Sequence, residues 1–176
     1  MWKIIASALA ILGVGSMTSS AATPPSKGSG DLREMVFSLQ PSEIGMKPGM
    51  SSHGVWGLVM ETGLDHGYYT LVALGDGTVS LYFSNGGGVI GAGTHQTVHS
   101  AAHKLLEQAN GAVAYSQPAS GTQPPAQGIT NFYFLTFDGT RKYTAQENSL
   151  GESQDKLSPL FYAAQDVITA VREATP

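Results

Sequence analysis

Three histidines recur at every fourth position in one stretch of the chain. They are His95, His99 and His103, and Glu107 continues the series. Residues four apart lie above one another on a helix, so two such imidazoles can chelate Zn²⁺, Cu²⁺ or Ni²⁺. The row also follows the flank of an expected apolar face, where helices commonly keep solvated polar residues. Two interpretations stay open: a metal site with zinc as its cofactor, and a solvated helix flank, which the sequence favours.

A run of glycines precedes this row. Gly86, Gly87, Gly88 and Gly91 match a GxGxxG pattern, and Thr94 follows as a candidate N-cap. In dinucleotide-binding folds such glycines bring the backbone close to a pyrophosphate at a helix N-terminus. Here the preceding strand belongs to an expected antiparallel hairpin, and the helix begins after the motif. The run therefore predicts a strand-to-helix connection that needs positive φ, with an anion site at the amides near Thr94 as the alternative.

Acid–base chemistry has one further candidate group. Glu61, Asp65 and His66 lie near an expected turn between strands, and His53 lies upstream. A histidine beside carboxylates can titrate near neutral pH. Because turns are rich in such residues for other reasons, we assign no catalytic residue from this group.

The aromatic residues point to binding. They make both faces of the expected sheet apolar, at Tyr68, Tyr69, Tyr82, Phe132, Tyr133, Phe134 and Phe137. If helices cover one face, something must bury the other. One candidate is the N-terminal segment around Met35, Val36 and Phe37. The other is a protein partner or a second copy of the chain.

These residues are expected to sit on three strands, a helix, two strands and a helix. Apolar residues alternate in the strands and follow a three-four spacing in the helices. The strands are expected at 55–61, 68–74, 78–84, 132–137 and 140–146, and the helices at 94–109 and from Ser158, which would be an N-cap before Pro159. Tight turns between strands require antiparallel pairing. The sequence thus predicts an α+β fold, an antiparallel sheet of about five strands with two amphipathic helices on one face.

The segment from Asp76 to Gly91, DGTVSLYFSNGGGVIG, resembles the core of a family of uncharacterised bacterial proteins. That family has no established activity, so the resemblance implies no catalytic residues. Each half of the chain also has a hairpin followed by a helix, a pattern shared by profilin-like and roadblock-like domains. This is an analogy of fold and transfers no function.

The N-terminus is typical of an exported protein. Lys3 precedes an apolar run from Ile4 to Met17, and Ser20-Ala21-Ala22 fits a cleavage site. The run is shorter than the ~20 residues that span a bilayer, so no stable membrane anchor is expected. We predict a signal peptide at 1–22, a flexible, partly ordered leader at 23–53 and one α+β domain at 54–176. The alternative is a mis-assigned start codon, with a cytoplasmic product.

Composition narrows the function further. The net charge is −4, and no lysine or arginine occurs from Pro48 to His103, so we expect no nucleic-acid binding. The chain has no cysteine, which excludes disulfides and thiolate catalysis. The preferred hypothesis is an exported, non-catalytic binding or assembly module that binds a protein partner or itself. The alternatives are a small metal-dependent or acid–base enzyme built on the histidine row, and a structural or inhibitory partner of another secreted protein.

Overall fold

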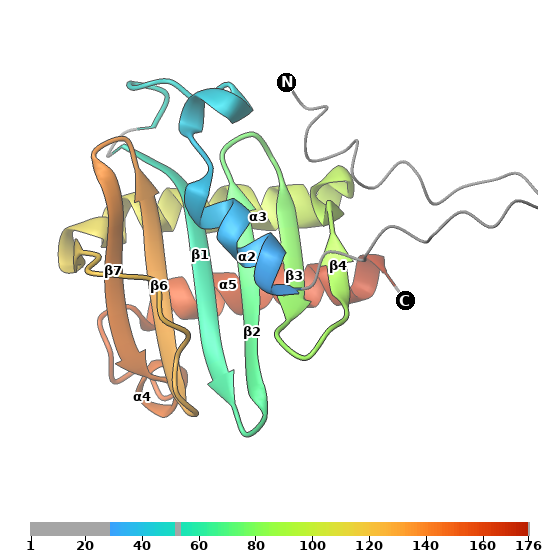
Figure 1. The fold of residues 1–176 in the computed structure, drawn as a ribbon, viewed down its shortest axis with the longest axis vertical. Helices are drawn as coiled ribbons and strands as arrows, with labels where there is room; N and C mark the ends of the chain where they lie inside the picture. The colour runs from blue at the N-terminus through green and yellow to red at the C-terminus, as the bar shows by residue number, and fades with distance from the viewer. Residues whose placement is uncertain (1–28, 52–53, 176) are drawn as a thin grey trace, which may run out of the picture.

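A computed structural model describes residues 29–51 and 54–175. The expected signal peptide and His53 lie outside these residues. Within the described residues, seven strands form one antiparallel sheet in the order β4-β3-β2-β1-β6-β7-β5 (Figure 1). The strands are β1 (Val55–Leu64), β2 (Gly67–Leu74), β3 (Val79–Phe83), β4 (Gly88–Ile90), β5 (Gln117–Pro118), β6 (Ile129–Thr136) and β7 (Gly139–Gln146).

The predicted class, α+β with an antiparallel sheet, is confirmed, whereas the expected number and order of strands are wrong. The sheet gains β4 before the first long helix and β5 after it. Both segments were expected to be connections. They have only three and two residues, too few to show an alternating apolar pattern. Their backbone pairing with β3 and β7 makes them strands.

Two long helices, α3 (Gln96–Ala112) and α5 (Ser158–Ala174), lie side by side behind the sheet in Figure 1. Their apolar stripes, which include Leu105 and Val167, pack on Phe132 and Phe134 of β6 in one core. The three-four spacing in the sequence produces this burial directly. A short helix, α4 (Glu147–Gly151), precedes α5 and was not expected.

The start of α5 differs from the prediction. Ser158 is the first helical residue, and Leu157 occupies the N-cap position. Among the described residues no side chain caps α5, but the Oδ1 of Asp155, two residues before the N-cap, accepts a hydrogen bond from the Leu157 amide at 2.7 Å. The Asp155 amide donates to Ser158 Oγ at 3.3 Å. Asp155 therefore forms a local turn just before the helix, and the expected N-cap role of Ser158 is wrong.

The opposite face of the sheet is covered by α2 (Ser29–Ser38), which crosses in front of the strands in Figure 1. Leu32, Val36 and Phe37 of this helix pack on an apolar cluster from four strands, with a 3₁₀ turn (Pro41–Ile44) following. We call this surface the α2 face; its buried strand residues are Trp56, Val59, Glu61, Thr70, Val72, Leu74, Ser80, Tyr82, Asn131, Tyr133 and Leu135. The N-terminal segment thus fills the place for which the sequence left two occupants open.

The rest of the α2 face lies under the loop 119–128. Gly63 of β1 forms an isolated parallel bridge with Gln127, and the Tyr133 hydroxyl donates to the carbonyl of Gln123 at 3.0 Å. A Cβ on Gly63 would lie 2.0 Å from the carbonyl oxygen of Ala126, so only glycine permits this close approach. The loop is therefore pressed against the sheet beside α2.

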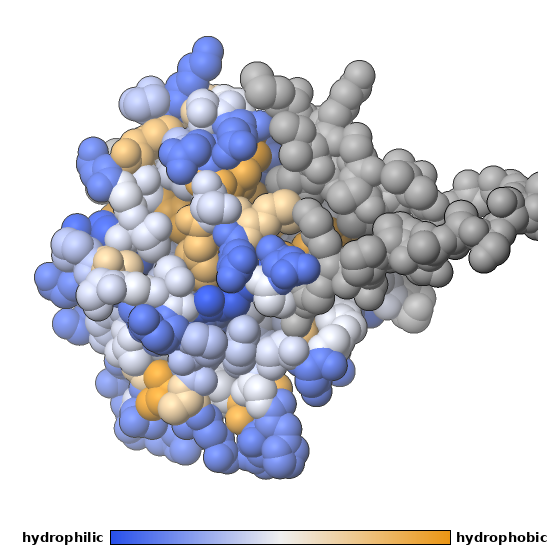
Figure 2. Space-filling model, in the orientation of Figure 1, coloured by the Kyte–Doolittle hydropathy of each residue, from blue (hydrophilic) through white to orange (hydrophobic). Residues whose placement is uncertain are grey.

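The outer surface is mainly polar on the α2 side, and both edges of the sheet are short. From the α2 side, hydrophobic residues reach the surface beside α2, among mainly hydrophilic ones (Figure 2). The sheet ends in β4 at one edge and in β5, which contains Pro118, at the other. Among the described residues, no helix is both long and apolar enough to cross a membrane.

Candidate binding site beneath α2

A buried carboxylate lies at the centre of the α2 face. Glu61 is on β1, and alternation along the strand turns its side chain toward α2, where it is fully buried. Arg33 of α2 donates from Nε to Glu61 Oε1 at 2.6 Å and from Nη2 to Oε2 at 2.9 Å. The hydroxyl of Thr70 donates to Oε1 at 3.1 Å. The result is a bidentate ion pair, and Thr70 of the neighbouring strand β2 orients its carboxylate.

Arg33 joins three parts of the chain. Besides Glu61, its Nη2 donates to the carbonyl of Thr122 in the loop 119–128. Its guanidinium carbon lies 4.9 Å from the ring centroid of Phe37 and 5.8 Å from that of Tyr68. Burial works to lower the pKa of Arg33, but the hydrogen bond and charge of Glu61 outweigh it, so the net shift is upward. The arginine therefore stays charged and fastens α2 and the loop to the sheet.

The free-energy cost of breaking this ion pair limits which segments could cover the α2 face. Removing one partner of a buried ion pair leaves an uncompensated charge, which typically costs about 3–5 kcal/mol. Glu61 has no exposed surface, whereas the side chain of Arg33 is 12% exposed. Any segment that replaced α2 without admitting water would therefore have to bring its own cation to Glu61.

Two other polar groups on the same face are buried without a partner. Among the described residues, Trp56 Nε1 and the Tyr82 hydroxyl have no hydrogen-bond partner. Water can hardly replace one, because each residue is only 4% exposed. Buried polar atoms are usually satisfied, and an unsatisfied one costs about 1–3 kcal/mol. Burial, followed by the charge of Glu61, raises the pKa of Tyr82. The α2 face thus contains binding capacity that α2 itself does not use.

Tyr133 lies on the same face but is satisfied. Its hydroxyl donates to Gln123, and its ring packs edge-on against Phe37 with centroids 4.9 Å apart. Burial, with the charge of Glu61 as the next cause, raises its pKa to about 12. Tyr133 therefore provides an internal comparison for Tyr82, because both are buried phenols near Glu61.

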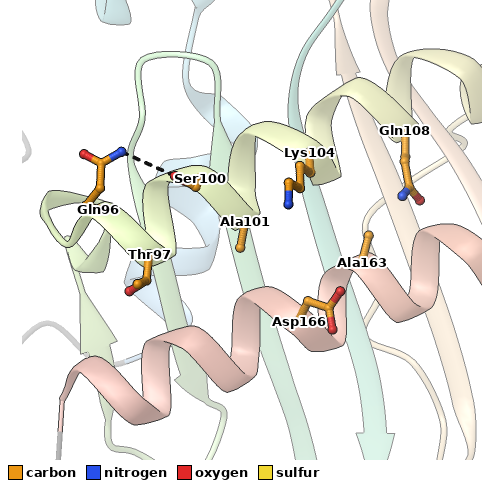
Figure 3. A pocket seen from close by; sticks show the side chains of 8 residues that line it. All are labelled: Gln96, Thr97, Ser100, Ala101, Lys104, Gln108, Ala163 and Asp166. Carbon is orange, nitrogen blue, oxygen red and sulfur yellow. Dashed lines mark hydrogen bonds between the residues drawn. The ribbon is translucent and has the colours of Figure 1, made fainter.

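A second candidate site is the groove between α3 and α5 (Figure 3). It has a volume of about 390 Å³, and Lys104 of α3 and Asp166 of α5 line it from opposite sides. In the part of the chain that the structure describes, these two side chains form no ion pair within 4.0 Å. Ala101 and Ala163 are the less exposed lining residues, and every polar lining residue is exposed. A ligand here would stay largely in water, whereas small-molecule sites bury most of their ligand.

The histidine row is shorter on the helix than expected. His95 is the N-cap residue of α3, which begins at Gln96, so only His99 and His103 lie on the helix with Glu107. All four are exposed, and His103 Nδ1 lies 3.7 Å from Glu107 Oε1. Across residues 29–51 and 54–175, no three histidine, cysteine or acidic residues are grouped to hold a metal ion. This geometry fits a solvated flank, and zinc binding stays a prediction.

The glycine run forms a hairpin rather than a strand-to-helix connection. Gly86, Gly87 and Gly88 have φ values of 102°, 83° and 141° and turn the chain from β3 into β4. After β4, the amides of Thr94 and His95 donate to Gly91 and Ala92 at 3.4 and 3.1 Å. The need for positive φ was predicted correctly, but β4 separates the glycines from α3. The amides expected at an anion site are bonded to the chain itself.

The acid–base group is dispersed. Glu61 turns toward Arg33 on the α2 face, while Asp65 and His66 are exposed in the turn between β1 and β2. Asp65 accepts a hydrogen bond from Gln127. The structure therefore brings Glu61 together with Arg33 and not with the histidine.

Sequence reasoning missed the partners of Glu61, although two signals were present. Glu61 is the only charged residue in the apolar strand VWGLVMETGL, and a buried acid needs a cation. Arg33 is the only basic residue between Lys27 and Lys47. Together these facts could have paired the two, whereas nothing in the sequence indicated the carbonyl of Thr122.

No protein-family model, curated protein or solved structure shows a significant match to this chain. The function must therefore be argued from the geometry of the α2 face and of the groove.

Proposed function

We propose that this chain is an exported, non-catalytic binding module whose binding surface is the α2 face. In this proposal a segment of a protein partner takes the place of α2 on the sheet. The observation that carries it is the buried carboxylate of Glu61, which is neutralised by Arg33 of a separate short helix rather than by a neighbouring strand. A face built only for packing would be apolar at this position.

Several features support α2 as a cover that can leave. It has ten residues, and isolated helices shorter than about 12–15 residues are marginal in water. It contacts the sheet through side chains and is connected to β1 by residues 39–54. The long helices α3 and α5, in contrast, pack on one another as well as on the sheet. Opening of α2 would therefore leave the main core intact.

The unsatisfied atoms of Trp56 and Tyr82 favour binding over a purely structural role. A partner segment that offers hydrogen-bond acceptors at these positions would gain contacts that α2 does not make. This gain would help it to compete with a helix that is covalently attached and therefore present at high effective concentration.

Binding can be tested in the full chain with Trp56 as the reporter. The protein has two tryptophans, so Trp2→Phe leaves Trp56 as the only one. Arg33→Ala is added to loosen α2, and a synthetic peptide of residues 29–46 is titrated while Trp56 emission is recorded. We expect saturable binding in the micromolar range and none with a scrambled peptide. If neither this variant nor the parent chain binds the peptide, the proposed surface is wrong.

Export is tested separately by expressing the full chain in a bacterium and measuring the mass of the product in each compartment. We expect a periplasmic or extracellular protein that lacks residues 1–22. An uncleaved cytoplasmic product would contradict export without affecting the binding surface.

A further inference from the structure

We infer that the α2 face contains a binding site for an arginine side chain, through which it selects an amphipathic helical segment of another protein. This inference rests on the proposed function and names the chemistry of the partner. We call the site the guanidinium socket; it consists of the carboxylate of Glu61, the carbonyl of Thr122 and the ring of Tyr68, with Thr70 orienting Glu61. All four belong to the sheet or the loop 119–128, and without α2 the loop is still held to the sheet by the Tyr133–Gln123 hydrogen bond and the Gly63–Gln127 bridge.

The socket matches the shape of a guanidinium group. Glu61 accepts two N–H groups at 2.6 and 2.9 Å, the Thr122 carbonyl accepts from the same Nη2 atom, and the Tyr68 ring lies 5.8 Å away. A planar fork of five donors can meet both carboxylate oxygens and a third acceptor at once. The ammonium of lysine is a compact, strongly hydrated charge and cannot form this bidentate arrangement. We therefore expect selection of arginine over lysine.

The spacing of the partner's residues can be read from α2. Its apolar contacts come from Val36 and Phe37, three and four positions after Arg33, and from Leu32 just before it. Residues three and four apart share one face of a helix. The partner segment is therefore an amphipathic helix with an arginine followed by apolar residues at these two positions.

A different protein fits the face better than a second copy of this chain. If two copies exchanged their α2 helices, each sheet would receive the same side chains that it has now. Trp56 Nε1 and the Tyr82 hydroxyl would then remain unsatisfied, as in the single chain. A segment of different sequence can supply acceptors to these two atoms, whereas an exchanged α2 supplies none.

The test uses the full chain with Trp2→Phe and Arg33→Ala, and three peptides of residues 29–46. One has the natural arginine, the second has lysine in its place, and the third has citrulline, which keeps the shape but not the charge. Hydrogen bonds to charged groups typically account for about a tenfold to hundredfold change in affinity. We expect the lysine peptide to bind about tenfold more weakly and the citrulline peptide more weakly still. Adding Glu61→Gln should remove the preference for arginine.

Each outcome has a distinct meaning. Equal binding of the three peptides would overturn the arginine site and leave the proposed surface standing, whereas absence of binding by all of them would overturn the surface. If Arg33→Ala does not fold, the same titration in the chain that retains Arg33 answers the question at higher peptide concentrations, because α2 then competes. As a control for exchange, Arg33→Glu and Glu61→Arg chains are mixed. Heterodimers that neither chain forms alone would identify a second copy as the occupant and overturn the choice of a different protein.

Discussion

The two faces of the sheet are buried by different chemistry. On the face under α3 and α5, the core is apolar, and the buried threonines Thr62 and Thr130 hydrogen-bond to one another at 2.9 Å. On the α2 face, a carboxylate is buried against Arg33, and Trp56 and Tyr82 carry polar atoms that have no hydrogen-bond partner among the described residues. The first arrangement maximises stability. The second gives up some stability, which fits the proposed role of the α2 face as a binding surface.

The largest expected effect is the difference between the two faces in the free energy of unfolding that is lost when an aromatic ring is removed. Phe134→Ala empties a fully buried site under α3 and α5 and should lower the free energy of unfolding by about 3–5 kcal/mol. Phe37→Ala removes a half-buried ring of α2 and should lower it by less than half as much, because under the proposed function α2 opens without global unfolding. Urea denaturation followed by circular dichroism measures both. Equal losses would mean that α2 belongs to the same cooperative unit.

The next effect concerns the ion pair. Arg33→Met should destabilise the chain by about 2–3 kcal/mol, less than the usual loss for a stranded buried charge, because an opened α2 lets water reach Glu61. Combining it with Glu61→Leu should recover most of the loss, since an apolar pair needs no compensation. A double-mutant cycle in urea measures the coupling between the two residues. Additive losses would show that the pair does not act as a unit.

A matched pair of tyrosines gives a smaller effect with opposite signs. Tyr82→Phe removes a buried hydroxyl that has no partner and should stabilise the protein by up to about 1 kcal/mol. Tyr133→Phe removes a hydroxyl bonded to Gln123 and should destabilise it by about 1 kcal/mol. Thermal unfolding of the two variants and the parent decides this. Destabilisation by Tyr82→Phe would indicate that its hydroxyl has a partner in solution, such as bound water.

The smallest effect is a pH dependence. Tyr133 has a pKa of about 12 in the folded chain, above its ordinary value of 10.0, so the unfolded chain loses this proton first. Its contribution to stability is therefore complete below pH 10 and is lost as pH rises toward 12. Between about pH 9.5 and 10.5 the loss should be about 0.7 kcal/mol. Tyr133→Phe should show a correspondingly shallower decline in urea titrations, whereas identical slopes would place the phenol in contact with water.

Regions of the molecule also differ in how much of their structure the sequence predicts. Apolar runs or alternation predicted β1, β2, β3 and β6, the turn at Asp138-Gly139 predicted β7, and three-four spacing predicted both long helices. β4 and β5 were not predicted, because backbone pairing with β3 and β7, rather than their own composition, makes them strands. The expected number of strands was therefore too low.

The candidate site was harder to predict than the fold. Glu61 was noticed as a candidate acid, but its partner Arg33 is 28 residues away in the chain, and no local pattern relates the two. Whether the N-terminal segment or another molecule covers the α2 face depends on a docking that strand periodicity does not encode. The histidine row, in contrast, has a clear spacing but loses His95 because α3 begins one residue later.

The brevity of the outermost strands has a consequence for a protein at high concentration. Fibrils grow when a free backbone edge templates another chain, and each end of this sheet offers only two or three residues for such growth. Pro118 also lacks an amide hydrogen, which removes a rung from any added ladder. If α2 opens as proposed, such a chain should still resist fibril formation at high concentration, because the sheet edges stay short.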